Sequence, residues 1–469
     1  MSATLQPSFH AGFSGVIGVA QSDITPPVGI YARNWGAAKH DAAESIHRPL
    51  TLTALTLQTS PDAPPLVLIG ADLGWFRGAA TEASVREPIL QALKIGPERL
   101  MFNLSHTHSA PVLSLEPIAE KGGEHTAAFL KRVRDAALQT ARTALGSARP
   151  ATLEWAMGRC DLARNRDLPD PEKNRIVCGY NPANSADDTL LVGRVTTELE
   201  GRERVIATLV NYACHPVTLA WENRAISPDF VGAMRETIEA QTSAPCLFLQ
   251  GASGELAPAE EYVGDTSVAD RHGRRLGHAA LSVLSGMLPR ETELAYNGVV
   301  ESGAPLAVWS RRPHAPSRAL GAVRATTAYA IKKDYPPAAE IERQISACTD
   351  RVMTERLNRK LAVRKSLGDA PTADGSLWVW RIGDVYMLGV PNEAYSSLQL
   401  ELRRRLAPRT VAVMNLVNGG TAYLPPASLY DTDIYQVWQT PFDRGCLEQT
   451  LELGARCVEE LSAAKENRV

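Results

Sequence analysis

Phe102-Asn103-Leu104-Ser105-His106-Thr107-His108-Ser109-Ala110-Pro111 is the most informative stretch of the chain, because an apolar run ends there in two histidines separated by one residue. In an extended backbone, residues i and i+2 point to the same face, so His106 and His108 can act together on one ion or one proton. The alternative is a polar turn whose side chains only satisfy local backbone groups. The chain has only 10 histidines, which makes the pair the first candidate site.

The segments around this stretch predict the fold class. Two patterns typical of amphipathic helices, at 83–94 and 124–145, lie on either side of the apolar run 100–104. Upstream, strands are expected at 50–57 and 66–71, and the second is continuously apolar, as in the centre of a sheet. This order predicts an α/β protein (mixed α+β), with mixed sheets flanked by helices and a candidate site, for an ion or a proton, at strand ends.

Other predicted strands also end in polar residues. The strand at 205–212 leads to His215, and Ser227 is expected to cap the next helix. Asp72 follows a buried strand, where an acid is either a site residue or a helix cap. Asp72, or Asp229 near the start of that helix, is a candidate to orient one of the site histidines.

The C-terminal part supplies a carboxylate and two tyrosines. A hairpin at 377–390 leads to Glu393, which is expected to open a helix, where its charge would otherwise only complement the helix dipole. The last strand, at 410–416, precedes Tyr423 and Tyr435.

Composition excludes several classes of protein. A net charge of −3 and a pI near 6.4 give no basic face for nucleic acid. Seven cysteines, odd in number and dispersed, suit reduced thiols. No apolar run is long enough for an integral membrane segment, and the N-terminus lacks the pattern of a signal peptide. A cytoplasmic protein is therefore expected, and the sequence predicts no oligomeric state.

The candidate residues are spread from 106 to 435, and no internal repeat is visible, so they are expected to converge in a single catalytic unit over 1–469. Its parts would be 1–290 with the histidines, a connecting helical region at 291–375, and 376–469 with the glutamate and tyrosines. Within the middle part, 334–367 is highly charged with one narrow apolar stripe, which indicates a surface helix or part of a lid.

Five fragments, taken in order over roughly residues 15–445, resemble the neutral/alkaline (non-lysosomal) ceramidase family. They are 18–29 (Gly-Val-Ala-Gln-Ser-Asp-Ile-Thr-Pro-Pro-Val-Gly), 105–111 (Ser-His-Thr-His-Ser-Ala-Pro), 211–216 (Asn-Tyr-Ala-Cys-His-Pro), 391–393 (Pro-Asn-Glu), and Tyr423 with Tyr435. The resemblance covers the catalytic domain. Family members also carry a C-terminal immunoglobulin-like domain and a secretion or membrane signal, and this chain is expected to have neither.

The resemblance implies a set of site residues. The zinc ligands would be His106, His215, Glu393 and Tyr423, and the catalytic residues would be His108, Arg166 and Tyr435. The family's Asn-Arg-Ser-Pro motif is Asn165-Arg166-Asp167-Leu168 here, which leaves Arg164 as an alternative to Arg166. The stretch 425–429 also departs from the family, so substrate contacts there are expected to differ.

Two imidazoles and a carboxylate around an open position form a catalytic set for Zn²⁺, although iron or manganese would also suit these donors. The reaction expected is hydrolysis of the amide bond of a small N-acyl substrate, with His108 as general base and Arg166 and Tyr435 stabilising the oxyanion. The alternatives are an esterase or lactonase, an inactive zinc-binding protein, and a phosphoester hydrolase.

Overall fold

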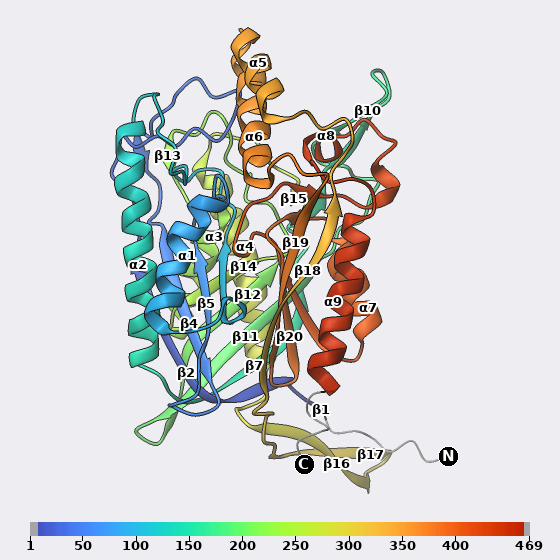
Figure 1. Cartoon of the computed structure of the whole chain (residues 1–469). Helices are drawn as coiled ribbons and strands as arrows, with labels where there is room; N and C mark the ends of the chain where they lie inside the picture. Colours follow the sequence, from blue (N-terminus) through green and yellow to red (C-terminus); the bar gives the residue numbers. More distant parts are fainter. Residues whose placement is uncertain (1–7, 464–469) are drawn as a thin grey trace.

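Two β-sheets enclose a shared apolar core, and helices cover their outer faces (Figure 1). The computed structural model describes residues 8–463 of the chain. Helices α5 (Ala338–Ala347) and α6 (Arg351–Leu367) stand above the strand ends at the top of the view.

The larger sheet has eight strands of mixed direction. Strands β12 and β14 are parallel, as are β5 and β6, and the other neighbours are antiparallel. The sheet is curled, since β14 at one edge also lies against β5 and β6. Across the sheet, the strands are β14 (Cys246–Gln250), β12 (Arg202–Tyr212), β11 (Thr189–Leu199), β7 (Arg149–Arg159), β2 (Gly12–Asp23), β4 (Thr51–Gln58), β5 (Leu66–Ala71) and β6 (Leu100–Leu104).

The smaller sheet has four strands, β18 (Leu320–Ala330), β19 (Thr372–Ile382), β20 (Val385–Gly389) and β22 (Thr410–Met414). A three-stranded ribbon contains β1 (Ser8–Phe9), β16 (Thr292–Glu301) and β17 (Pro305–Pro313). The short paired strands are β3 (Ser45–Ile46) with β13 (Ala225–Ile226), β8 (Ala163–Asn165) with β15 (Leu256–Pro258), β9 (Asp167–Asp170) with β10 (Arg175–Cys178), and β21 (Glu393–Ala394) with β23 (Tyr423–Leu424).

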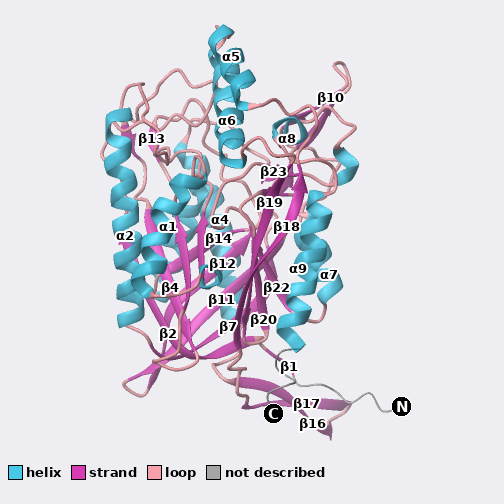
Figure 2. Ribbon diagram, in the orientation of Figure 1, coloured by secondary structure: helices cyan, strands magenta, loops and turns pink. Residues whose placement is uncertain are grey.

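Three pairs of helices lie outside the sheets (Figure 2). One pair is α1 (Ala79–Leu93) and α2 (Thr126–Gly146), the next is α3 (Phe230–Thr242) and α4 (Thr266–Gly286), and the third, on the smaller sheet, is α7 (Ser397–Leu406) and α9 (Cys446–Ala463). The remaining helices are α8 (Tyr435–Gln439) and the 3₁₀ turns η1 (Pro97–Arg99), η2 (Gly123–His125) and η3 (Ala427–Leu429).

Strand β5 is continuously apolar because both of its faces are buried. Leu66 and Leu68 pack into the core between the sheets, whereas Val67 and Ile69 pack against α1 and α2. Alternate residues of a strand face opposite sides, and both sides are buried here. Each such side chain stabilises the fold by about 1.5–3 kcal/mol relative to exposure.

The segment that follows β22 joins the two sheets. The Leu104 amide donates to the Leu416 carbonyl at 3.3 Å, and the Asn415 amide donates to the Gln250 carbonyl at 2.9 Å. The Asn103 side chain donates to the Asn415 carbonyl at 2.7 Å and accepts from the Gln250 amide at 3.0 Å. These bonds bring the ends of β6, β14 and β22 together beside the candidate site.

The predicted class is confirmed, because a large mixed sheet is flanked by helices. The prediction of a connecting helical region at 291–375 is wrong for its first part, which forms β16, β17 and β18. Strands β16 and β17 form a largely exposed ribbon, so their sequence lacks the apolar alternation of a half-buried strand. The charged stretch 334–367 is two helices, and the Asp350 side chain caps the second by accepting from the Met353 amide at 2.8 Å.

Two predicted helix starts are also wrong. Helix α3 is capped by Asp229, and Ser227 instead accepts a hydrogen bond from the Asp229 amide at 2.9 Å. Glu393 lies in strand β21, paired with Tyr423, and α7 begins only at Ser397. The Glu255 carboxylate accepts from the Ser396 amide at 2.9 Å, which satisfies a donor at the true start of the helix.

All seven cysteines are free, in agreement with the expectation of reduced thiols. Among residues 8–463, no helix is long and apolar enough to cross a membrane.

Candidate metal centre

His106 is placed by an unusual backbone conformation two residues after β6. Its φ is +70°, in the left-handed region that non-glycine residues rarely adopt, and its amide donates to the Leu73 carbonyl at 2.9 Å. The imidazole is buried, with Nδ1 3.5 Å from the Gly74 carbonyl oxygen. The sequence argument for an extended His-x-His pair is therefore wrong, because a turn and not a strand directs this side chain.

His215 enters the site three residues after β12. Its amide donates to the Leu256 carbonyl at 2.8 Å, and its Nδ1 lies 2.6 Å from the Ser253 carbonyl oxygen. Burial, reinforced by the charge of Arg166, lowers the pKa of His215 to about 3, so the imidazole is neutral at pH 7.

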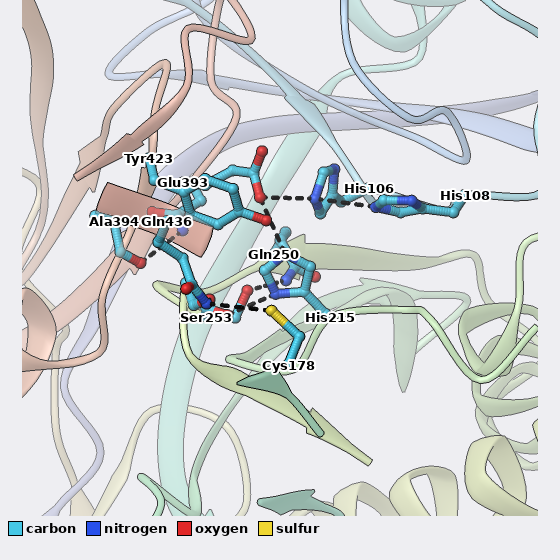
Figure 3. Close-up of polar contacts among 12 residues, drawn as sticks. His106, His108, Cys178, His215, Gln250, Ser253, Glu393, Ala394, Tyr423 and Gln436 are labelled. Atoms are coloured by element: carbon cyan, nitrogen blue, oxygen red, sulfur yellow. Dashed lines mark hydrogen bonds and ion pairs between the residues drawn. The ribbon is translucent and has the colours of Figure 1, made fainter. Parts of the chain in front are cut away.

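Glu393 completes a compact group with the two histidines. Its Oε2 lies 3.2 Å from His106 Nε2 and 3.0 Å from His215 Nε2 (Figure 3). The three potential ligand atoms lie within 4.8 Å of one another. Its partner in β21–β23 pairing is Tyr423, so one short parallel bridge positions both side chains.

The donor chemistry of this group fits a divalent cation. When Nδ1 of each histidine donates to a backbone carbonyl, Nε2 carries a lone pair. Two such lone pairs and a carboxylate oxygen within 4.8 Å of one another repel, and a cation between them turns that repulsion into coordination. His106, His215 and Glu393 are therefore able to hold a metal ion.

His108 lies beside this group and not within it. Its Nε2 is 3.4 Å from His106 Nε2, and its ring lies between the indoles of Trp35 and Trp75, with ring centroids 5.0 and 5.1 Å away. Burial, followed by the influence of His106 and His215, lowers the pKa of His108 well below its ordinary value. His108 is thus a neutral base next to the candidate metal position.

Arg166, and not Arg164, reaches the cluster. The buried Arg166 has Nη2 3.1 Å from His215 Nε2, 3.2 Å from the Tyr423 hydroxyl and 2.8 Å from the Gly254 carbonyl oxygen. Arg164 instead pairs with Asp161 at 2.9 Å near the surface. Of the two arginines that the sequence left open, Arg166 is the one that lies beside the His-His-Glu group.

Both tyrosines lie near the group. The Tyr423 ring stacks on the His215 ring, with centroids 6.3 Å apart, and the Tyr435 ring lies 5.8 Å from Tyr423. Burial, reinforced by the Glu393 charge, raises the pKa of Tyr423 well above its ordinary value. Burial also raises the pKa of Tyr435, which is the first residue of α8.

Asp72 and Asp229 do not orient the histidines as predicted. Asp72 accepts from Arg235 at 2.5 Å and from the Thr51 amide at 2.8 Å, whereas Asp229 accepts from the Leu219 amide at 2.9 Å. Backbone carbonyls hold the two imidazoles instead, and sequence reasoning has no means to locate a carbonyl that only the fold brings near.

Three further residues contribute to the site without having been predicted. Trp35 and Trp75 enclose His108, and the Arg359 guanidinium of α6 lies over the Trp75 ring, 5.3 Å from its centroid. The only feature of the sequence that points to Arg359 is the charged stretch 334–367, which indicates a surface helix or part of a lid.

His108 also lines a small cavity. Its lining includes Arg33, Asn34, Trp35, His40, Asn223 and Arg224.

Comparisons with known proteins place the fold. No protein-family model and no curated protein sequence matches the chain. Among solved structures, neutral ceramidase from Pseudomonas aeruginosa is similar over 96% of this chain and 74% of that chain, with a TM-score of 0.64 and 18% sequence identity. A ceramidase complexed with C2 is similar over 95% of this chain and 74% of that chain, with a TM-score of 0.64 and 16% identity. The chain therefore has the fold of the neutral ceramidase of Pseudomonas aeruginosa.

Proposed function

We propose that this protein is a zinc-dependent hydrolase that cleaves the amide bond of an N-acyl substrate. The observation that carries the proposal is the convergence of His106 Nε2, His215 Nε2 and Glu393 Oε2 within 4.8 Å, with His108 and Arg166 beside them. The shared fold with two ceramidases supports the choice of an amide as the substrate.

The chain would hold Zn²⁺ through His106, His215 and Glu393, with Tyr423 as a fourth ligand. Zinc in such a set polarises a carbonyl group and makes water acidic enough to attack at neutral pH. The backbone carbonyls of Gly74 and Ser253, which contact the two Nδ1 atoms, orient both Nε2 atoms toward Glu393.

His108 would move the proton. As a neutral imidazole it accepts a proton from the attacking water while the water oxygen bonds to the carbonyl carbon. It then gives that proton to the nitrogen as the C–N bond breaks, so that an amine and a carboxylic acid are released. The indoles of Trp35 and Trp75 pack against this ring and restrict its motion.

Arg166 and Tyr435 would stabilise the negative charge that develops on the carbonyl oxygen. One well-placed donor of this kind contributes about 3 kcal/mol to lowering the barrier. The Gly254 carbonyl accepts a hydrogen bond from Arg166 Nη2 at 2.8 Å, so the guanidinium is positioned before substrate arrives.

An ester or lactone would use the same groups and is the second candidate, because the oxyanion chemistry is shared. A phosphoester substrate has less support. Sites for phosphoester hydrolysis commonly hold two metal ions, and the metal-binding group here contains a single carboxylate.

The test is a hydrolysis panel of N-acyl amines, ceramides, aryl esters and phosphoesters, run with the zinc-loaded protein, with and without a chelator. We expect amide cleavage that the chelator abolishes and added zinc restores. Turnover confined to phosphoesters would refute the proposal.

A further inference from the structure

Helix α6 is a strongly basic element in a chain with a net charge of −3. It carries six arginine and lysine residues and a single acidic residue, Glu355. Figure 1 shows α6 standing above the strand ends from which the site residues come. Its side chains therefore contribute to the electrostatic field above those strand ends.

Arg359 brings this charge close to the candidate catalytic groups. Its guanidinium lies 5.3 Å from the centroid of the Trp75 ring, and that ring in turn lies 5.1 Å from His108. One indole thus contacts both the cation and the imidazole. Arg359 is held in place by Nε, which donates to Glu355 at 3.1 Å, and by Nη2, which donates to the Asn34 carbonyl.

The charge of Arg359 is not fully compensated. Glu355, the acid nearest to it, also lies 3.6 Å from Arg77, so one carboxylate serves two guanidinium groups. Burial alone would raise the pKa of Glu355, yet the charges of Arg359 and Arg77 lower it. Positive charge therefore remains in this partly buried place, where attraction to an anion is stronger than in bulk water.

Arg356 and Lys360 add two cations on the Tyr435 side. Both lie over the Trp438 ring, at 5.4 and 5.7 Å from its centroid, and Trp438 stacks on Tyr435 with ring centroids 6.3 Å apart. Neither cation forms an ion pair with an acid in the described part of the chain. By contrast, Arg351 and Lys365 on the same helix are paired, with Asp41 and Glu342.

We propose that the substrate is an N-acyl amino acid, and that its carboxylate binds to the cationic surface formed by Arg356, Arg359 and Lys360. This inference rests on the proposed amide hydrolysis and names its substrate class. In an N-acyl amino acid one carbon separates the amide nitrogen from the carboxylate. A single molecule can therefore place its amide beside His108 and Tyr435 and its carboxylate beside the cations, which share aromatic neighbours with those two residues. A neutral ceramide gains nothing from three cations at this position.

The experiment compares N-acylglycine with N-acylethanolamine of the same acyl chain, which differ only in carboxylate against hydroxymethyl. In the zinc-loaded protein we expect kcat/KM to be at least tenfold higher for N-acylglycine, mainly through KM, and the preference to shrink as salt is raised. Arg359→Gln should reduce the preference about tenfold, and Lys360→Gln or Arg356→Gln about threefold. Arg351→Gln and Lys365→Gln are the matched controls and should leave it unchanged.

A second measurement follows binding without turnover, through the change in tryptophan fluorescence when N-acylglycine is added. The variant Trp438→Phe shows whether that change comes from Trp438. Binding that weakens in Arg359→Gln supports the inference even if no amide is hydrolysed, in which case only the proposed function fails. Equal use of both substrates, or a preference that survives Arg359→Gln, overturns the inference and leaves the hydrolase intact. Absence of any binding of N-acylglycine also overturns it.

Discussion

His108 is the residue for which position and protonation state agree best with a proton-transfer role. It contacts His106 through Nε2 at 3.4 Å, and its ring lies between two indoles. We expect His108→Ala to retain metal but to lose about 10²- to 10⁴-fold in kcat, the usual contribution of general acid–base catalysis. His278→Ala, an exposed histidine of α4, is the control. Full activity in His108→Ala would show that another group carries the proton.

Arg166 and Arg164 together give a second prediction. Its Nη2 is shared by His215, Tyr423 and Gly254, a geometry that a lysine ammonium on a flexible stem does not reproduce. Arg166→Lys should lower kcat by about 10²- to 10³-fold, whereas Arg164→Lys should remain within twofold of the wild type. If Arg164→Lys were the impaired variant, the assignment of the active-site arginine would be reversed.

The residues of the site could be predicted from the sequence, but their geometry could not. The family fragments indicated His106, His215, Glu393 and Tyr423, and all four lie close together. The left-handed conformation of His106 and the contacts of Nδ1 with backbone carbonyls depend on chain segments distant in sequence. Nothing near position 106 or 215 in the sequence reports those partners.

Among the elements, the loop that follows β14 supports the start of α7. The Glu255 carboxylate accepts hydrogen bonds from the Ser396 amide and hydroxyl, and burial raises the pKa of Glu255 from 4.5 to about 7. The pKa of Glu255 is higher in the folded protein than in the unfolded protein. The stabilisation that the protonated side chain provides is therefore fully present below pH 4.5. That contribution is lost as the pH rises to about 7.

Glu255→Gln removes this titration. Between pH 5 and pH 8 the free energy of unfolding of the wild type should fall relative to that of Glu255→Gln, by on the order of 2 kcal/mol. Urea denaturation of both proteins at the two pH values measures this. Parallel changes with pH in the two proteins would contradict a raised pKa at Glu255.

The type of an element was predicted well where burial leaves a clear pattern in the sequence. Strand β5 is buried on both faces and is continuously apolar, and helix α2 is buried on one face and is amphipathic. Boundaries failed where a tertiary contact decides them. Glu393 looked like the start of a helix because good helix formers follow it, but pairing with Tyr423 holds it in a strand. The exposed ribbon of β16 and β17 carries too little apolar alternation to be recognised.

The whole molecule depends on the junction at which β6, β14 and the segment after β22 meet, because that junction places His106 and Glu393 opposite each other. Asn103 bonds to both Asn415 and Gln250 there. We expect Asn103→Leu to leave the Gln250 amide and the Asn415 carbonyl without these partners and to lower the free energy of unfolding by about 2–4 kcal/mol. Zinc affinity should weaken as well.

Met101→Leu is the matched control, since Met101 is buried in the same strand and the change conserves volume. It should cost less than about 1.5 kcal/mol and leave zinc affinity unchanged. Unaltered zinc affinity in Asn103→Leu would mean that the junction does not position the ligands. The meeting of two sheets at this place was not predictable, because it depends on a curl of the large sheet that no local pattern encodes.

The most direct test of the account is the zinc content of the purified protein after equilibration with a small excess of zinc and removal of the unbound ion. We predict one zinc ion per chain in the wild type, and its loss in His106→Ala, His215→Ala and Glu393→Gln but not in His108→Ala. A wild type that retains no more zinc than His215→Ala would contradict the central claim that these three side chains form a metal centre.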